Sequence, residues 1–308
     1  MSKSGVDHVA TFVAAESFTL TPAALTAALM RAGVAGGPLQ WLEPGVAADA
    51  AIACAPGDAR DIQAQFKRAL GSAPVDIIVQ PIAARRKALL VADMDSTMIE
   101  QECIDELADL LGIRDRIAPI TARAMRGEID FEAALRERVA LLRGLTTDAI
   151  DHVLTTRVSF SKGAATLVAT MRAAGAHTAL VSGGFTLFAD RIARALGFDE
   201  FRANRLIVDA GVITGALEEP VSGAMDKARA LEAMRVSTGA AHDATLAIGD
   251  GANDLPMIEA ASLGVAWRAR PRVAALADAR LDHADLTALL YAQGFRRSDF
   301  IAATPAFR

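Results

Sequence analysis

The chain has 308 residues, of which 52% are hydrophobic and 22% are charged, and its formal net charge is -5 at pH 7. This length is enough for about two domains with sizeable cores. Charged residues interrupt every apolar run well before the roughly 18 residues that a membrane span needs, so no transmembrane helix is expected. Acidic residues outnumber basic ones by 37 to 32, and no long basic run occurs, which gives nucleic-acid binding no support.

Features near the N-terminus and the cysteine pattern favour a cytoplasmic protein. Asp7 and His8 fall where a secretory signal would need an unbroken apolar core, so no export is expected. Cys54 and Cys103 lie far apart without the spacing of a zinc site, and we expect two reduced, buried thiols. The basic triplet at 85–87 is expected to be a solvated segment that leads into the following strand.

The first part of the chain, residues 1–82, shows the element order strand, helix, strand, strand, helix, strand. Pro22 suits a first helical turn, and Gly33 and Gly71 suit the ends of helices. This order is that of a ferredoxin-like α+β unit, and we find no catalytic set of residues in it. The expected elements are, in chain order, 8–15, 22–32, 39–42, 50–54, 59–70 and 75–80.

In the second part, residues 83–308, short apolar runs alternate with helical segments. Such alternation predicts a doubly wound, mostly parallel α/β sheet covered by helices on both faces. A charged helical segment at about 104–157 is expected to form a cap over the edge of this sheet, and 202–217 is expected to form a hairpin. The apolar runs are ALLVAD (88–93), HTALVSGG (177–184), TLAIGDG (245–251) and LGVAW (263–267).

Polar residues follow three of these predicted strands, at the point where each strand ends. They are the segments DMDST (93–97), SGG (182–184) and GDGAND (249–254). Open α/β sheets bind ligands outside the carboxyl ends of their strands, so a single site could hold all three segments.

Three carboxylates would converge at this site, those of Asp93, Asp95 and Asp250. Their mutual repulsion would raise a pKa or require a cation. Oxygen ligands without a nearby His or Cys suit Mg²⁺. The sequence therefore predicts a magnesium site at the carboxyl edge of the sheet.

An anion-binding feature accompanies the carboxylates. Ser182 offers a hydroxyl and Gly183 a backbone N–H at a strand-to-helix turn, and Lys227 could add a positive charge. Each motif alone also has a structural explanation, as a loop aspartate, a tight glycine turn, a surface lysine or a helix cap. Their order and their common position at strand ends favour a phosphoryl-transfer site.

In combination, DMDST, VSGGF, Lys227 and GDGAND resemble the motifs of the phosphoserine phosphatases of the haloacid dehalogenase superfamily, over about residues 83–290. The resemblance implies a haloacid dehalogenase-like fold with a helical cap inserted after the first strand. It implies that Asp93 is the nucleophile and Asp95 the general acid and base. It further implies that the Asp93 carboxylate, the Asp95 backbone carbonyl and the Asp250 carboxylate hold Mg²⁺.

The same resemblance assigns residues to the phosphoryl group. Ser182, Gly183, Lys227 and Asn253 would contact it. Asp254 would position Lys227 or a metal-bound water.

The cap carries a charged residue on an apolar helical face. Arg138 falls on the face that Phe131 and Leu135 also occupy, so it needs an anionic partner. An ion pair within the cap, with Glu128 or Glu132, remains an alternative to a substrate carboxylate.

For these cap positions the resemblance implies contacts with an amino-acid substrate. Glu102 and Arg138 would hold its amino and carboxylate groups, and Met125 and Phe131 would close over it. The expected activity is the Mg²⁺-dependent hydrolysis of O-phospho-L-serine, the last step of serine biosynthesis. The alternatives are a phosphotransferase or a phosphatase for another small phosphomonoester, and an amino-acid sensor with a vestigial phosphatase unit.

The N-terminal unit resembles ACT-like regulatory domains in its element order and position. Binding of L-serine by residues 1–82 is a hypothesis on this basis. Homodimer formation and simple packing against the rest of the chain are equally compatible with the sequence.

Overall fold

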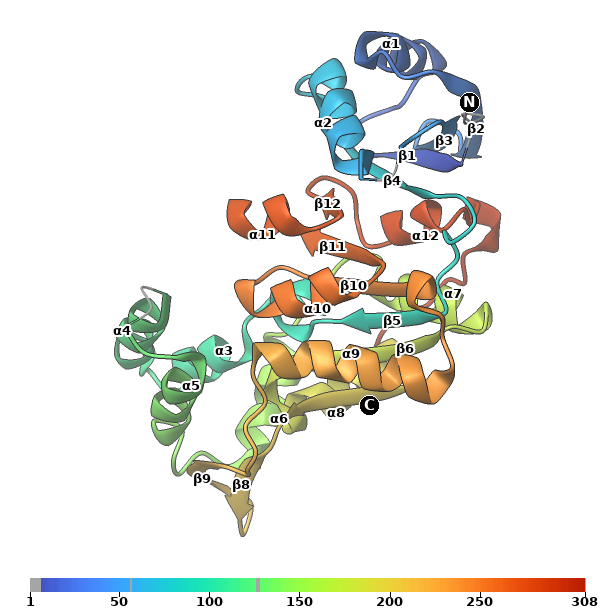
Figure 1. Cartoon of the computed structure of the whole chain (residues 1–308). Helices are drawn as coiled ribbons and strands as arrows, with labels where there is room; N and C mark the ends of the chain where they lie inside the picture. The colour runs from blue at the N-terminus through green and yellow to red at the C-terminus, as the bar shows by residue number, and fades with distance from the viewer. Residues whose placement is uncertain (1–6, 56, 126–127, 308) are drawn as a thin grey trace.

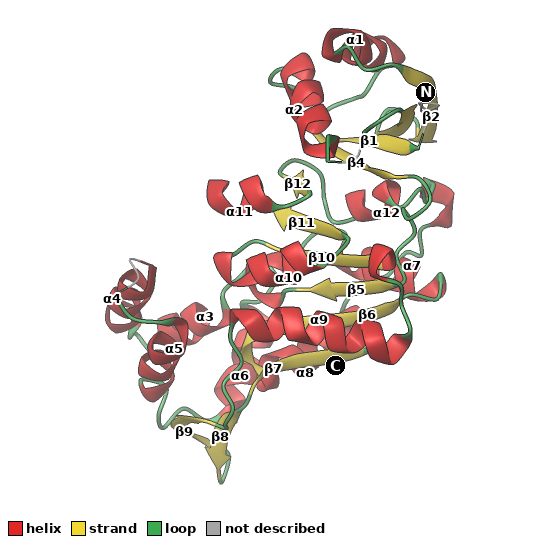
Figure 2. Cartoon of the chain, viewed as in Figure 1, coloured by secondary structure: helices red, strands yellow, loops and turns green. Residues whose placement is uncertain are grey.

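The structure is a computed structural model that describes residues 7–55, 57–125 and 128–307. Within these ranges it contains a four-stranded antiparallel sheet, a six-stranded parallel sheet and a two-stranded hairpin, as Figures 1 and 2 show. None of the helices in these ranges has both the length and the apolar character that crossing a membrane requires.

The N-terminal unit has the predicted order of elements and a ferredoxin-like sheet, with strand order β2-β3-β1-β4. Its two helices pack on one face of this sheet, where the Phe12 and Phe66 rings meet edge to face with their centroids 5.0 Å apart. Its elements are β1 (His8–Ala14), α1 (Pro22–Ala32), β2 (Gly36–Glu43), β3 (Ala47–Ile52), α2 (Ala59–Leu70) and β4 (Val75–Pro81).

The other face of the N-terminal sheet packs against the C-terminal part of the chain. The buried Asp76 carboxylate accepts hydrogen bonds from the backbone N–H groups of residues 282–284, at 2.8 to 3.0 Å. The side-chain amide of Gln80 donates to the Ala292 carbonyl at 2.8 Å. Buried polar groups therefore fix the position of the N-terminal unit on the rest of the molecule.

The expectation of a solvated basic segment at 85–87 is wrong for two of its three residues. Arg85 is half-buried and donates to the Asp49 carboxylate at 2.8 Å and to the Ala292 carbonyl at 3.1 Å. Lys87 is 7% exposed, and its ammonium donates to the Asp243 carbonyl at 2.9 Å. Burial lowers the pKa of Lys87 to about 8.

The central sheet has the order β12-β11-β10-β5-β6-β7, and every neighbouring pair is parallel. Its strands are β5 (Leu89–Ala92), β6 (His177–Phe185), β7 (Glu200–Asn204), β10 (Thr245–Gly249), β11 (Leu263–Trp267) and β12 (Ala279–Leu281). All carboxyl ends therefore lie at one edge, as the doubly wound prediction requires.

Helices cover both faces of this sheet, with α9 and α10 in front and α7 and α8 behind in Figure 1. Alternate residues of β5 explain this arrangement, because Leu89 and Val91 join the core under α9 while Leu90 and Ala92 join the core on the opposite side. The helices are α7 (Ala164–Ala173), α8 (Thr186–Leu196), α9 (Ala224–Thr238), α10 (Leu255–Ala260), α11 (Pro271–Leu276) and α12 (Ala288–Ala292).

The segment after β5 is helical, as expected, and lies beyond the carboxyl end of the sheet (Figure 1). It contains α3 (Cys103–Leu110), α4 (Arg114–Met125), α5 (Phe131–Ala140) and α6 (Thr147–Thr156). The predicted hairpin is also present, as β8 (Leu206–Asp209) and β9 (Val212–Leu217), and it packs against the cap. Backbone hydrogen bonds from Gly144 and Thr147 to the hairpin carbonyls of Ile213 and Gly211, each 2.9 Å, make this late segment part of the cap.

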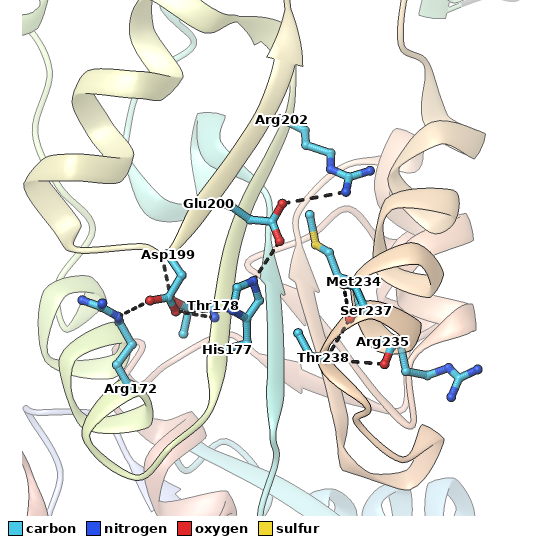
Figure 3. Close-up of polar contacts among 10 residues, drawn as sticks. All are labelled: Arg172, His177, Thr178, Asp199, Glu200, Arg202, Met234, Arg235, Ser237 and Thr238. Atoms are coloured by element: carbon cyan, nitrogen blue, oxygen red, sulfur yellow. Dashed lines mark hydrogen bonds and ion pairs between the residues drawn. The ribbon is translucent and has the colours of Figure 1, made fainter.

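The opposite, amino end of the sheet carries a cluster of structural polar contacts, shown in Figure 3. The Asp199 carboxylate accepts from Arg172 Nε at 2.8 Å and from the Thr178 backbone N–H at 2.9 Å. His177 Nε2 and Glu200 Oε1 lie 2.8 Å apart. These contacts join α7 and β7 to β6.

Candidate active site

A cavity of about 590 Å³ lies between the carboxyl ends of β5, β6 and β10 and the cap helices. Most of the residues singled out in the sequence line it. They are Asp93, Asp95, Glu102, Phe131, Arg138, Ser182, Gly183, Asp250 and Asn253. Lys227 and Asp254 lie buried behind Asp93, while the Met125 side chain lies outside the described part of the structure.

A wide turn, Met94–Met98, separates the first two carboxylates. The Ile99 N–H donates to the Met94 carbonyl at 3.1 Å, and Ser96 takes a left-handed backbone conformation with φ of 54°. The Ser96 hydroxyl donates to Glu102 at 2.7 Å. The turn thus sends Asp95 toward the start of α3 and leaves Asp93 at the end of the strand.

Asp93 belongs to a buried charged triad. The Lys227 ammonium donates to Asp93 Oδ1 and, at 2.6 Å, to Asp254 Oδ1, and each of the three residues is at most 4% exposed. Burial and the Asp254 carboxylate raise the pKa of Asp93, and the Lys227 ammonium opposes this rise. Burial lowers the pKa of Lys227, but the Asp254 and Asp93 carboxylates outweigh it, so the pKa is raised and Lys227 remains a cation.

The GDGAND segment places Asp254 beside Lys227, which also contacts Asp93. Asp254 Oδ2 accepts from the Gly251 N–H at 3.0 Å, which closes the turn after β10. A methyl group added at Gly249 would lie 2.6 Å from the Asp254 Cβ, so this position has no room for a side chain. The glycine therefore lets Asp254 lie against the end of β10, where its carboxylate contacts Lys227.

Asp95 has surroundings suited to proton transfer. Its Oδ1 accepts from the Cys103 backbone N–H at 3.1 Å, which fixes the carboxyl group at the start of α3. Burial, followed by the Glu102 carboxylate, raises the pKa of Asp95 to about 7. A carboxyl group with such a pKa can both donate and accept a proton near neutral pH.

On the β6 side, Ser182, Gly183 and Gly184 line the cavity. The Gly184 N–H donates to Ser182 Oγ at 2.8 Å. The Asn204 side chain donates to the Gly183 carbonyl at 2.9 Å and accepts from the Ser222 N–H at 2.7 Å. Asn204 therefore holds the glycine turn in place from the neighbouring strand.

Several oxygen donors can reach one cation. Carboxylate oxygens of Asp93, Asp250 and Asp254 all lie within 4.8 Å of one another. Burial, followed by the Asp254 carboxylate, raises the pKa of Asp250 to about 6, as expected for an uncompensated carboxylate. The Thr97 hydroxyl donates to Asp250 Oδ1 at 3.4 Å. This oxygen-only donor set fits Mg²⁺.

The described part of the cap contributes one cation, Arg138, and one aromatic ring, Phe131, to the cavity. Arg138 Nε donates to the Ala134 carbonyl of its own helix at 3.2 Å. Burial lowers the pKa of Arg138, and the Asp105 and Glu102 carboxylates counteract this effect. A methyl group added at Gly183 would lie 3.0 Å from Phe131 Cζ, so the ring reaches across the cavity to the core.

The alternative prediction that Arg138 pairs with Glu132 is wrong. Glu132 accepts instead from Arg136 at 2.6 Å, and Arg136 also reaches Glu219 at 2.6 Å. The Arg138 guanidinium therefore lines the cavity without that neutralising contact.

Comparison with known proteins places this geometry in a family. The family model for haloacid dehalogenase-like hydrolases matches residues 90–259. A phosphoserine phosphatase of Archaeoglobus fulgidus is 39% identical over 75% of this chain and 68% of its own length. One from Albidiferax ferrireducens is 44% identical over 66% of this chain and 87% of its own length. The chain belongs to the phosphoserine phosphatases of the haloacid dehalogenase-like hydrolases.

The solved structures agree with this membership. A probable phosphoserine phosphatase from Vibrio cholerae has a TM-score of 0.76 and 31% identity, and the match covers 95% of this chain and 88% of that one. The protein is thus a phosphatase, an enzyme of the phosphoric monoester hydrolase class.

Some residues that shape the phosphatase site were missed by sequence reasoning. Ser96 and Thr97 stand inside the DMDST motif, which was a usable signal, and they orient Glu102 and Asp250. Asn204 carries no local signal, because its partners come from other segments of the chain.

Proposed function

We propose that the enzyme hydrolyses O-phospho-L-serine to L-serine and phosphate with Mg²⁺, through an aspartyl-phosphate on Asp93, as the last step of serine biosynthesis. The observation that carries this proposal is one cavity lined by Asp93, by Glu102 just before α3 and by the cap residue Arg138. Asp93 suits phosphoryl transfer, whereas Glu102 and Arg138 suit the ammonium and carboxylate groups of an amino acid. The names of the relatives support the same substrate.

In the first step, an Asp93 carboxylate oxygen attacks phosphorus and the bond from phosphorus to the seryl oxygen breaks. Protonated Asp95 gives its proton to the departing seryl oxygen, which leaves as a serine hydroxyl. The raised pKa of Asp95, about 7, favours a proton there near neutral pH. The product on the enzyme is an acyl phosphate at Asp93.

In the second step, water attacks the phosphorus of this acyl phosphate. Asp95, now ionised, accepts the proton of that water, and the Asp93 carboxylate leaves. Inorganic phosphate is released and both aspartates return to their starting states. Two carboxyl groups with different surroundings can thus act as nucleophile and as acid and base.

The phosphoryl group requires positive charge and hydrogen-bond donors around it. Lys227, the Ser182 hydroxyl, the Gly183 N–H and the Asn253 side chain would contact its oxygens, and Asp254 would hold Lys227 in place.

The metal ligands proposed are the Asp93 carboxylate, the Asp95 backbone carbonyl and the Asp250 carboxylate. When bound, Mg²⁺ supplies charge that stabilises the phosphoryl oxygens and ends the repulsion among the carboxylates. The Asp254 carboxylate lies near enough to belong to this cluster, but its bond to Lys227 favours a supporting role.

Substrate recognition is assigned to the cap and the start of α3. Glu102 would bind the substrate ammonium and Arg138 its carboxylate, since guanidinium groups bind carboxylates with two hydrogen bonds. Phe131, and by resemblance Met125, would cover the bound substrate. Closure of this kind excludes water from the reacting groups.

The metal requirement is tested by chelation. Steady-state hydrolysis of phosphoserine is expected to fall to background when a chelator removes divalent ions, and to return when Mg²⁺ is added in excess. The physical reason is the carboxylate cluster, which repels a phosphate dianion until a cation is bound. Full activity in chelator would contradict the assignment.

Recognition of the substrate carboxylate is tested with Arg138→Ala. Phosphoserine hydrolysis is expected to lose about 2–4 kcal/mol of transition-state stabilisation, a factor of about 30 to 10³, because a charged hydrogen-bond partner is removed. Hydrolysis of a simple aryl phosphate, which lacks the carboxylate, is expected to change far less. The measurement is kcat/KM for both substrates.

The matched control for that experiment is Arg136→Ala on the same helix. Arg136 pairs with Glu132 and Glu219 at the cap surface, so its loss is expected to affect both substrates little. Equal losses on the two substrates in Arg138→Ala would show that Arg138 serves only the packing of the cap.

The division of the chain into an N-terminal ACT-like domain (1–82) and a phosphatase domain (83–308), with a cap at about 104–157, is retained as a proposal. Binding of L-serine, homodimer formation and a cytoplasmic location also stay predictions.

A further inference from the structure

Two arginines at the active-site cavity, Arg270 and Arg272, have no assigned role in the proposed hydrolysis. Arg270 and Arg272 line the cavity, and both are exposed. They stand just after β11 and at the start of α11, which Figure 1 shows at the same end of the sheet as α4 and α5. The cavity therefore lies between the cap on one side and an arginine-bearing segment of the core on the other.

The backbone holds this segment in a fixed place. The Arg268 N–H donates to the Leu281 carbonyl at 2.8 Å, and the Arg270 carbonyl accepts from the Val273 and Ala274 N–H groups at 3.0 Å. Pro271, between the two arginines, restricts φ, and Val273 is buried. The backbone that carries both arginines is thus anchored to the sheet.

The charge balance of the cavity indicates that additional positive charge near it would favour the approach of an anionic substrate. Its walls carry the carboxyl groups of Asp93, Asp95, Glu102 and Asp250, and in the proposed mechanism that of Asp95 starts protonated. Before a metal ion binds, the three other carboxylates outnumber the two cations Arg138, within the cavity, and Lys227, behind it. The whole chain has a net charge of -5. A phosphomonoester dianion therefore approaches a negative protein, and repulsion slows its capture unless local positive charge offsets it.

We propose that Arg270 and Arg272 form an electrostatic entrance that captures the anionic phosphomonoester before it reaches the reacting groups. This inference rests on the proposed hydrolysis of an anionic phosphomonoester, and it assigns the arginines a positioning role through charge. The entrance acts on association, so it affects kcat/KM and leaves kcat nearly unchanged. It recognises the phosphate charge, so it serves any small phosphomonoester alike.

Salt provides the test, because exposed charges are screened over a Debye length of about 30 Å at 0.01 M and about 3 Å at 1 M ionic strength. In the double variant Arg270→Gln/Arg272→Gln, kcat/KM for phosphoserine is expected to fall about 3- to 10-fold at low ionic strength. The deficit is expected to shrink to less than about twofold near 1 M, where screening removes the attraction. An aryl phosphate should show the same loss, in contrast to Arg138→Ala.

Two companion variants separate charge from shape. Arg270→Lys/Arg272→Lys keeps both charges and is expected to stay within about twofold of the unaltered protein at every salt concentration. Arg194→Gln/Arg202→Gln removes two exposed arginines, of α8 and of β7, that do not line the cavity, and it controls for the change in net charge alone; Figure 3 shows Arg202 next to Glu200. It is expected to leave the salt dependence unaltered.

Three results would overturn the entrance. They are an unchanged kcat/KM at low salt, a loss that persists at high salt, and a loss confined to phosphoserine, which would make these arginines direct readers of the substrate. Should the unaltered protein hydrolyse the aryl phosphate but not phosphoserine, the proposed substrate fails, and the aryl phosphate data still decide the role of the arginines.

Discussion

Replacing Asp93 with asparagine is expected to reduce phosphoserine turnover by a factor on the order of 10⁴ or more, because the amide oxygen is a poor nucleophile and bears no charge. The fold is expected to survive, since Lys227 keeps its 2.6 Å contact with Asp254 and the amide oxygen of the introduced side chain can still accept a hydrogen bond. Steady-state kinetics and a thermal unfolding curve measure the two effects.

A matched control for this change is Asp109→Asn in the cap. Asp109 pairs with Arg114 at the cap surface and does not line the cavity, so its replacement is expected to leave kcat near that of the unaltered protein. If Asp93→Asn retained a near-native rate, Asp93 would not be the nucleophile.

Replacing Lys227 with methionine is expected to affect both activity and stability. Turnover is expected to fall by about 10²- to 10³-fold, because a charged donor to the phosphoryl oxygens is lost. Without the ammonium, the buried carboxylates of Asp93 and Asp254 in the metal-free protein lose the one cation that contacts them among the described residues. Breaking a buried ion pair in this way costs about 3–5 kcal/mol in the free energy of unfolding.

The stability loss in Lys227→Met is expected to depend on pH with a definite sign. The folded-state pKa of Asp93 is already raised by burial, and removal of the ammonium raises it further. A carboxyl group with a raised folded-state pKa stabilises the fold fully only when it is protonated in both the folded and the unfolded state. This stabilisation begins to be lost as pH rises above the unfolded-state pKa of about 3.9, and the loss is complete above the raised folded-state pKa. The deficit is therefore larger at pH 8 than at pH 5.

Thermal unfolding of metal-free protein at these two pH values measures the effect. Lys162→Met is the control, because Lys162 pairs with Glu16 at the surface and its loss should cost less than about 1 kcal/mol. A Lys227→Met protein as stable as the control at pH 8 would show that the buried triad carries no net stabilisation.

The positions of Asp93, Ser182 and Asp250 could be predicted because they depend on a general rule. Each follows an apolar run, and parallel strands bring their carboxyl ends to one edge of a sheet. The structure brings all three to one cavity. The βαββαβ order of the N-terminal unit was equally readable, since glycine and proline mark its element ends.

Features that depend on how separate units pack were not readable. Helical periodicity placed Arg138 on an inward face, but it could not show that Arg136 takes the Glu132 carboxylate. Contact of the Phe131 ring with Gly183 depends on the orientation of the cap, and Arg272 has no motif around it. Side-chain partners from distant segments leave no local pattern in a single sequence.

The basic triplet illustrates the same point. A run of charges normally indicates a solvated surface. Arg85, however, is half-buried against the carbonyl of Ala292, 207 residues later in the chain. Lys87 is buried because its ammonium reaches the Asp243 carbonyl. Their burial follows from partners that only the tertiary fold supplies.

The central claim is that phosphorus passes from the substrate oxygen to Asp93. The most direct measurement is rapid quenching of the enzyme in acid during turnover of ³²P-labelled phosphoserine, followed by peptide mapping. We predict label on the peptide that contains Asp93, released by hydroxylamine as expected of an acyl phosphate, and no label in Asp93→Asn. Absence of any covalent label under millisecond quenching, while product forms at the full rate, would contradict the mechanism.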